Sequence, residues 1–159
     1  MIHKHLHRVL NIGIILATLL LVVGLARQYE QYKRKANRII AVQGIDFARS
    51  KKTLLMFLQQ DCSVCQQSLP FYRDLMETYP DRAAVQFVLV TPNKTRIADE
   101  YFRQAGLAFS SVRQEPTGIL GVTLTPTLIL ADSNASVQGS WVGLLSVESQ
   151  SEIRNKLTD

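Results

Sequence analysis

The segment LQQDCSVCQQSLP, residues 58–70, decides the fold of this chain and the chemistry expected of it. It follows a short apolar run, residues 53–58, whose length and composition predict a buried strand. The residues after the cysteines predict a helix that continues to about Tyr79. Cys62 therefore falls at the start of this helix, and Cys65 lies nearly one turn further along it.

These two cysteines are the only ones in the chain. A helix N-terminus favours the thiolate form, because free backbone N–H groups and the positive end of the helix dipole point toward it. This placement predicts that Cys62 attacks a disulfide and that Cys65 resolves the resulting mixed disulfide. Two thiols alone do not make a zinc site. At this spacing a disulfide between them would not link distant parts of the fold. The pair is therefore either a redox dithiol or two inert core residues, and its position after a strand favours the first.

Short apolar runs and helical stretches alternate along the rest of the chain, which predicts an α/β fold with helices on the faces of a sheet. The turn composition of residues 132–134 separates the last two expected strands, and Ser146 is suited to cap the last helix. Further strands are expected at residues 84–90, 108–112, 127–130 and 137–142, and further helices at residues 94–105, at 117–120 and from 146 onward.

Taken together, these features resemble the thioredoxin superfamily, and within it the redoxin or TlpA-type branch of membrane-anchored thiol–disulfide oxidoreductases. Pro70 stands eight residues after Cys62, like the proline that kinks the active-site helix of that superfamily. The segment GVTLTPTLIL, residues 121–130, is similar to the family's Thr-Pro-Thr segment, and GSWVG, residues 139–143, resembles its last strand and closing glycine. The resemblance covers roughly residues 44–157 and implies a thioredoxin-like fold, with a mixed central sheet flanked by helices.

The resemblance also implies roles for two residues far from the cysteines in sequence. Pro126 is expected to be cis and to face the thiols, as a third member of the catalytic set with Cys62 and Cys65. A cis X-Pro bond costs only about 0.5–1 kcal/mol relative to trans, so a packed loop can hold it. Backbone groups of Thr125 are expected to bind a substrate strand. The alternative is a proline that merely begins a strand.

Several residues depart from the family's pattern. Asp61 stands where many relatives carry Trp, and a carboxylate beside the thiol opposes thiolate formation. Met56 and Ser68 occupy the two positions where relatives carry an acid, so no proton-handling acid is carried over. Glu115 is a further candidate, for which surface exposure is expected. Gln59 replaces the threonine of the peroxiredoxin pattern, which argues against peroxidase activity.

The N-terminal part of the chain predicts a membrane anchor. Residues 9–26 are apolar and uncharged, and as a helix they would span about 27 Å, close to the roughly 30 Å of bilayer hydrocarbon. A cleaved signal peptide and a buried core helix are the alternatives. The expected organisation is a tail at residues 1–8, this anchor, a juxtamembrane helix or linker at residues 27–43, and the thioredoxin-like domain at residues 44–159.

The formal net charge of +5 does not point to nucleic acid. Residues 1–43 hold seven Lys or Arg against one acid, whereas residues 44–159 hold eleven against twelve. The basic excess thus lies beside the apolar segment, where anionic lipid headgroups are the expected counter-charge. The alternating His3, His5 and His7 are weak candidates for a metal site, and neither a metal nor a cofactor is expected.

The sequence therefore predicts a membrane-anchored thiol–disulfide oxidoreductase that exchanges electrons with protein thiols or disulfides and with a redox donor protein. The alternative is a thioredoxin-fold scaffold or interaction protein with a structural disulfide. Juxtamembrane charges alone favour a cytoplasmic domain under the positive-inside rule, whereas the family resemblance favours a bacterial inner-membrane protein facing the periplasm. We adopt the second expectation for the sidedness.

Overall fold

A computed structural model describes residues 18–25, 27 and 44–158, and the chain divides into two units that are considered separately. In the first unit, residues 18–25 form an exposed helical stretch. No helix within the described residues is both long and apolar enough to cross a membrane. Most of the anchor predicted at residues 9–26, the tail and nearly all of the predicted juxtamembrane segment lie outside the described residues.

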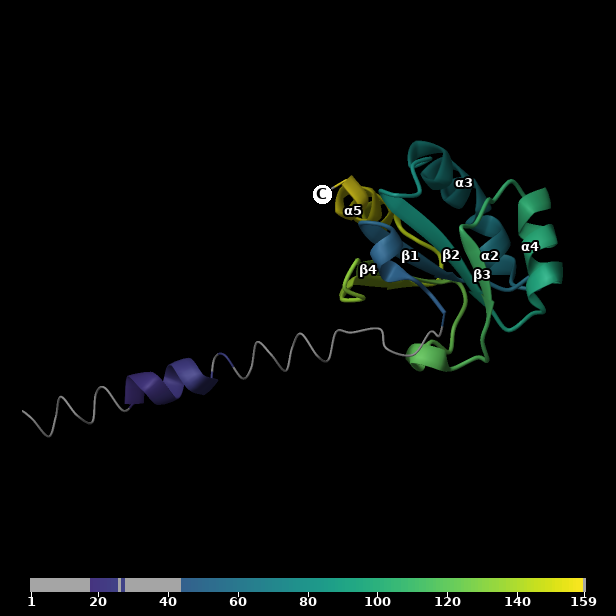
Figure 1. Ribbon diagram of the computed structural model, residues 1–159. Coiled ribbons are helices and arrows are strands. Elements are labelled where there is room, and N and C mark those ends of the chain that lie inside the picture. Colours follow the sequence, from purple (N-terminus) through teal and green to yellow (C-terminus); the bar gives the residue numbers. More distant parts are fainter. Residues whose placement is uncertain (1–17, 26, 28–43, 159) are drawn as a thin grey trace, which may run out of the picture. The chain divides into compact units, whose positions relative to one another are not determined.

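The second unit is built around a mixed sheet in which the strands lie in the order β3-β2-β1-β4-β5 (Figure 1). Strand β1 is central, parallel to β2 and antiparallel to β4, while β3 extends the parallel side and β5 the antiparallel side. The strands are β1 (Lys52–Phe57), β2 (Val85–Thr91), β3 (Ser111–Gln114), β4 (Thr127–Asp132) and β5 (Val137–Val142). The sequence predicted a mixed central sheet, and the structure has one.

The three inner strands are buried on both faces, which explains why their sequences are continuous apolar runs rather than alternating ones. On one face, Leu54, Met56 and their neighbours belong to a core that also includes buried side chains of α3, α4 and α5. The helical elements are η1 (Phe47–Arg49), α2 (Ser63–Gln67), α3 (Leu69–Thr78), α4 (Thr95–Gln104), η2 (Ile119–Gly121) and α5 (Val147–Thr158).

The opposite face of the sheet is covered differently from what the sequence predicted. Leu55, Phe57 and Ile129 pack there in a second, smaller core. The residues laid over them come from the segment around Phe47 and from the loop that holds η2, not from a long helix. The helices of this domain therefore share one face, and short 3₁₀ turns close the other.

The helix predicted from the cysteines to Tyr79 is interrupted. It forms as α2 and α3, which meet at Ser68, where the backbone N–H contacts the carbonyls of both Val64 and Cys65. Pro70 is the second residue of α3 and has no N–H to donate to the preceding turn, which accounts for a break at this point. The last helix begins after Ser146, whose hydroxyl accepts the N–H of Ser149, as the sequence predicted.

Candidate active site

The end of β1 delivers the cysteines to the surface. Leu58 is still buried, and its N–H donates to the carbonyl of Val90, so the chain leaves the sheet only after this residue. Three polar residues then lead to Cys62, which is the N-cap of α2 with an extended backbone. The N–H of Cys65 donates to the Sγ of Cys62 at 3.0 Å. A backbone donor at this position stabilises negative charge on that sulfur.

Cys62 and Cys65 form a disulfide, with their Cα atoms 5.1 Å apart. The two sulfurs differ in access, because Cys62 is partly exposed whereas Cys65 is completely buried in the helix-side core. A nucleophile from solvent therefore reaches the first cysteine before the second. This asymmetry agrees with the roles that the sequence predicted for the pair.

The Thr125–Pro126 segment, which holds the third predicted member of the site, lies beside the disulfide. The Thr125–Pro126 peptide bond is cis, and the carbonyl oxygen of Thr125 lies 3.5 Å from the Sγ of Cys62. Pro126 itself is buried, and its carbonyl accepts the N–H of Gly143 at 2.8 Å. The structure thus brings together all four residues singled out from the sequence, although they come from segments about 60 residues apart.

Two hydrogen bonds hold the loop before β4 in place. The hydroxyl of Thr127, which is buried, donates to the carbonyl of Leu124 at 2.7 Å. Gly143 has a φ of +80°, a conformation that side-chain-bearing residues rarely adopt, and this turn aims its N–H at Pro126. The residues on either side of Thr125, Leu124 and Pro126, are therefore each held by a hydrogen bond to their carbonyl.

Three large apolar side chains stand exposed around this loop, and sequence reasoning did not select them. Leu124, Val142 and Leu144 are 64%, 56% and 60% exposed, respectively. Val142 pairs with Thr127 across β4 and β5, and the other two residues flank Thr125 and Gly143. We call these three residues the apolar patch. In the sequence only Leu124 adjoins the Thr-Pro-Thr segment, and the other two residues are brought to it by the pairing of β4 with β5.

The two positions at which related proteins carry an acidic residue hold no acid in this chain. Met56 and Ser68 are buried in the helix-side region, 0% and 4% exposed. Glu115, for which exposure was expected, is instead partly buried and lines a small pocket together with Gln59 and Thr125. It is thus the carboxylate that the structure brings next to the loop of the site.

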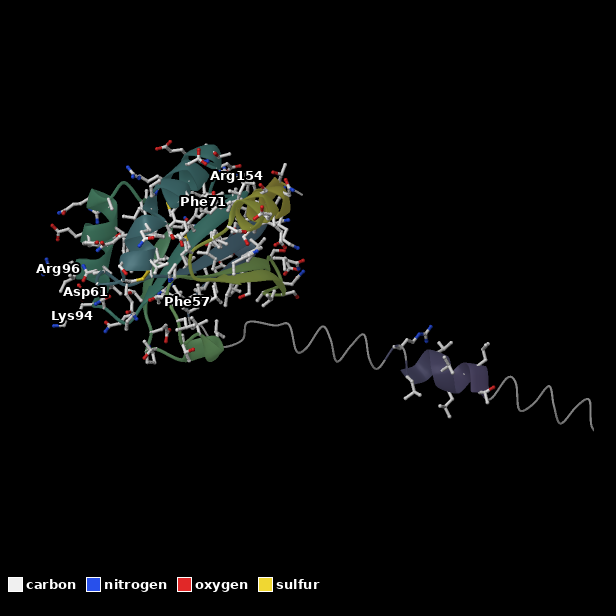
Figure 2. The ribbon with its side chains drawn as sticks, turned by 180° about the vertical axis from the view of Figure 1, so that it is seen from behind. Phe57, Asp61, Phe71, Lys94, Arg96 and Arg154 are labelled. Atoms are coloured by element: carbon white, nitrogen blue, oxygen red, sulfur yellow. A yellow bond between two sulfur atoms is a disulfide. The ribbon has the colours of Figure 1, made fainter. Side chains whose placement is uncertain are left out.

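Charged groups also surround the loop between β1 and α2. Asp61 is exposed, and none of the described residues forms an ion pair with it. The Gln60 amide donates to the carbonyl of Ile97, which ties this loop to the first turn of α4. Figure 2 shows Lys94 and Arg96 on the same side of the molecule as Asp61.

Metal-binding groups do not gather in the described part of the chain, where no cluster of three or more His, Cys, Asp or Glu side chains occurs. The three N-terminal histidines considered as metal ligands lie outside the described residues. Trp141 is 8% exposed, belongs to the helix-side core and donates its indole N–H to Glu152.

No protein-family model matches the chain. No curated protein matches its sequence either. Solved structures do match. A Chlorobium tepidum protein described as a thiol:disulfide interchange protein DsbE is 26% identical, with a TM-score of 0.56 over 70% of this chain and 81% of that one.

Two more distant structures show the same fold. StoA from Bacillus subtilis is 18% identical, with a TM-score of 0.53 over 70% of this chain and 84% of that one. The MTB protein dsbF is 22% identical, with a TM-score of 0.54 over 69% of this chain and 80% of that one. This chain has the thioredoxin-like fold, carries a C-x-x-C disulfide at Cys62 and Cys65, and has thiol:disulfide interchange proteins as its structural neighbours.

Proposed function

We propose that this protein is a thiol–disulfide oxidoreductase that exchanges electrons with protein thiols and disulfides through Cys62 and Cys65. One observation carries the proposal. The disulfide lies at the start of α2 with one sulfur accessible beside the Thr125 carbonyl and the other fully buried. A purely structural disulfide has no need of such an asymmetry, and this one closes a loop of only a few residues, which restricts the unfolded chain little.

In the reducing direction, the thiolate of Cys62 attacks one sulfur of a substrate disulfide. That disulfide breaks, one substrate thiolate leaves, and a mixed disulfide joins Cys62 to the substrate. The thiolate of Cys65 then attacks the Cys62 sulfur, and the second substrate thiolate leaves. The substrate has gained two electrons, and the chain holds its own disulfide. Oxidation of a substrate dithiol follows the same steps in reverse.

The surface around the site suits an extended protein segment as substrate. Thr125 is partly exposed beside Cys62, so its backbone can pair with a strand that carries the substrate cysteine. The apolar patch lies next to it. A partner that covers the patch removes apolar surface from water, which lowers the free energy of the complex. This arrangement favours protein substrates over small thiols.

Trapping of the mixed disulfide tests the proposal. Cys65→Ser removes the resolving thiol, so we expect it to accumulate covalent adducts with partners in the native host, whereas the matched Cys62→Ser variant should accumulate few. Mass spectrometry of the adducts identifies the substrates. If neither variant traps a partner while both remain folded, the disulfide is structural and the alternative of a scaffold protein is favoured. More adducts from Cys62→Ser would reverse the two roles.

We also propose that residues 9–26 anchor the protein in a membrane. The support is the uncharged apolar composition of this segment, followed by basic residues suited to lipid headgroups. The full chain should remain in the membrane pellet after carbonate extraction, and a chain beginning at Gly44 should not. A mature N-terminus at Arg27 in the native host would instead establish cleavage of a signal peptide.

For the sidedness we propose a periplasmic domain in a bacterial inner membrane. The likeness to thiol:disulfide interchange proteins supports it, while the basic residues after the anchor oppose it. A reporter that is active only outside the cytoplasm, fused after Asp159, should be active. A well-expressed but inactive fusion would place the domain in the cytoplasm, where the same chemistry would serve reduction.

A further inference from the structure

One buried hydroxyl on the helix that follows the disulfide forms no hydrogen bond of normal geometry. Tyr72 lies on α3 and is completely buried, yet its hydroxyl makes no hydrogen bond in the structure. Buried polar groups are nearly always paired, because an unpaired one loses its hydration without compensation. An unpaired hydroxyl in such a place points to a partner that exists in another state of the protein.

The position of Tyr72 indicates which partner this is. Between Ser63 and Thr78, three buried side chains carry a cysteine sulfur or a hydroxyl group. They are Cys65, Ser68 and Tyr72. Their spacing of three and four residues places them on one helical stripe. Ser68 keeps right-handed helical dihedrals between α2 and α3, so the stripe continues through the break.

The direction of the tyrosine side chain also favours the cysteine. Long side chains on a helix point back toward its N-terminus, over the preceding turn. The turn before Tyr72 holds Ser68, and the turn before that one holds Cys65. Burial raises the pKa of Tyr72 to about 12, and the neighbouring Ser68 hydroxyl, which forms no hydrogen bond of normal geometry with it, lowers that pKa by a smaller amount. The hydroxyl therefore keeps its proton over the whole physiological pH range and acts as a donor.

Opening of the disulfide changes what this donor meets. In the oxidised form the Cys65 sulfur is neutral and bonded to Cys62, and it is a poor acceptor. When a partner thiolate attacks Cys62, the bond between the two cysteines breaks and its electron pair passes to the Cys65 sulfur. A negative charge then appears at a fully buried atom, where desolvation disfavours it unless a donor is present.

We propose that the hydroxyl of Tyr72, with that of Ser68 beside it, donates a hydrogen bond to the Cys65 sulfur when the disulfide opens. This role rests on the proposed function, since it operates only while the disulfide opens and closes. Ser68 is tied to the Val64 carbonyl in the oxidised form, at 2.9 Å, and its hydroxyl can rotate away once a charged acceptor is present. Tyr72 thus stabilises the Cys65 thiolate in both directions. It does so when this thiolate leaves as the Cys62–Cys65 disulfide opens, and when it attacks Cys62 to close the disulfide again.

Tyr72→Phe tests this role, because it removes only the hydroxyl. We expect the acid dissociation constant of the Cys65 thiol to fall about tenfold. It can be measured from the ultraviolet absorbance of the thiolate in a protein that also carries Cys62→Ser. At a pH where Cys65 is ionised, we also expect a tenfold smaller equilibrium constant for reduction by dithiothreitol, which corresponds to a potential lower by about 30 mV. The oxidised variant should be no less stable than the unchanged protein, since the hydroxyl has no partner there.

Tyr79→Phe is the matched control. The Tyr79 hydroxyl is bonded to the Arg154 carbonyl and to Thr158, away from the disulfide. Its removal should destabilise both redox forms equally and leave the potential unchanged. An unchanged Cys65 pKa and potential in Tyr72→Phe would overturn the inference, as would equal destabilisation of both forms. Trapping of partners by Cys65→Ser does not depend on Tyr72, so failure of this inference is distinguishable from failure of the proposed function.

Discussion

Gly139 on β5 lies under the ring of Trp141, and a methyl group added there tests how tightly the indole is packed against this strand. A Cβ built on Gly139 would lie 2.8 Å from Cζ2 and 3.2 Å from Cζ3 of the indole. Carbon atoms prefer separations of about 3.5–4.0 Å, so the ring must move by several tenths of an ångström or more. The ring is buried and its N–H is bonded to Glu152 at 3.0 Å, so it cannot move freely.

We therefore expect Gly139→Ala to lower the free energy of unfolding by about 1–3 kcal/mol, the usual range for overpacking a core. Trp141 is the chain's single tryptophan, so its fluorescence reports both the urea midpoint and the displacement of the ring. The emission of the folded variant should shift to longer wavelength. Ser140→Ala, at an exposed neighbouring position, is the control and should change neither quantity. An unchanged midpoint and emission in Gly139→Ala would refute this account of the packing.

Three further outcomes follow from the geometry of the site. Thr127→Val removes the donor to the Leu124 carbonyl and should cost about 1 kcal/mol in urea unfolding, whereas an equally stable variant would show that this bond does not hold the loop. The double variant Leu124→Asp, Leu144→Asp should react with a protein disulfide at least tenfold more slowly than the unchanged protein. Its reaction with dithiothreitol should change little. Equal slowing of both reactions would mean that the apolar patch does not bind substrate. In the reduced protein, Cys62 should be alkylated with a pKa below the usual value of about 8.5 while Cys65 stays protected, and preferential alkylation of Cys65 would contradict the assigned order.

The sheet was the part of the fold most open to prediction from sequence. Its inner strands are buried on both faces, so they leave continuous apolar runs such as residues 53–58 and 84–90, and the observed strands lie within about two residues of them. Strand β3 was expected at residues 108–112, but it begins three residues later, at Ser111. Phe109 instead packs against the helix-side core, and β3 begins where pairing with β2 allows. Such pairing is a tertiary choice that local composition does not encode.

The site was predictable where a motif carries it and not where only tertiary packing does. Cys62, Cys65, Thr125 and Pro126 were selected from the C-x-x-C and Thr-Pro-Thr segments, and the structure places them together. The partner of Thr127, the exposure of the apolar patch and the approach of Glu115 depend on how distant segments meet. The unpaired hydroxyl of Tyr72 was also invisible, because a helical stripe predicts that a side chain is buried but not whether its polar atom is satisfied.

The reduction potential of the Cys62–Cys65 disulfide tests the central claim most directly. It can be measured in the full-length protein by equilibration with dithiothreitol or glutathione buffers and mass determination after alkylation of free thiols. An exchange-active pair with one accessible sulfur should have a potential between about −120 and −270 mV, the range of thioredoxin-like exchange proteins. A potential below about −300 mV, typical of structural disulfides, would contradict the assignment of this protein as a thiol–disulfide oxidoreductase.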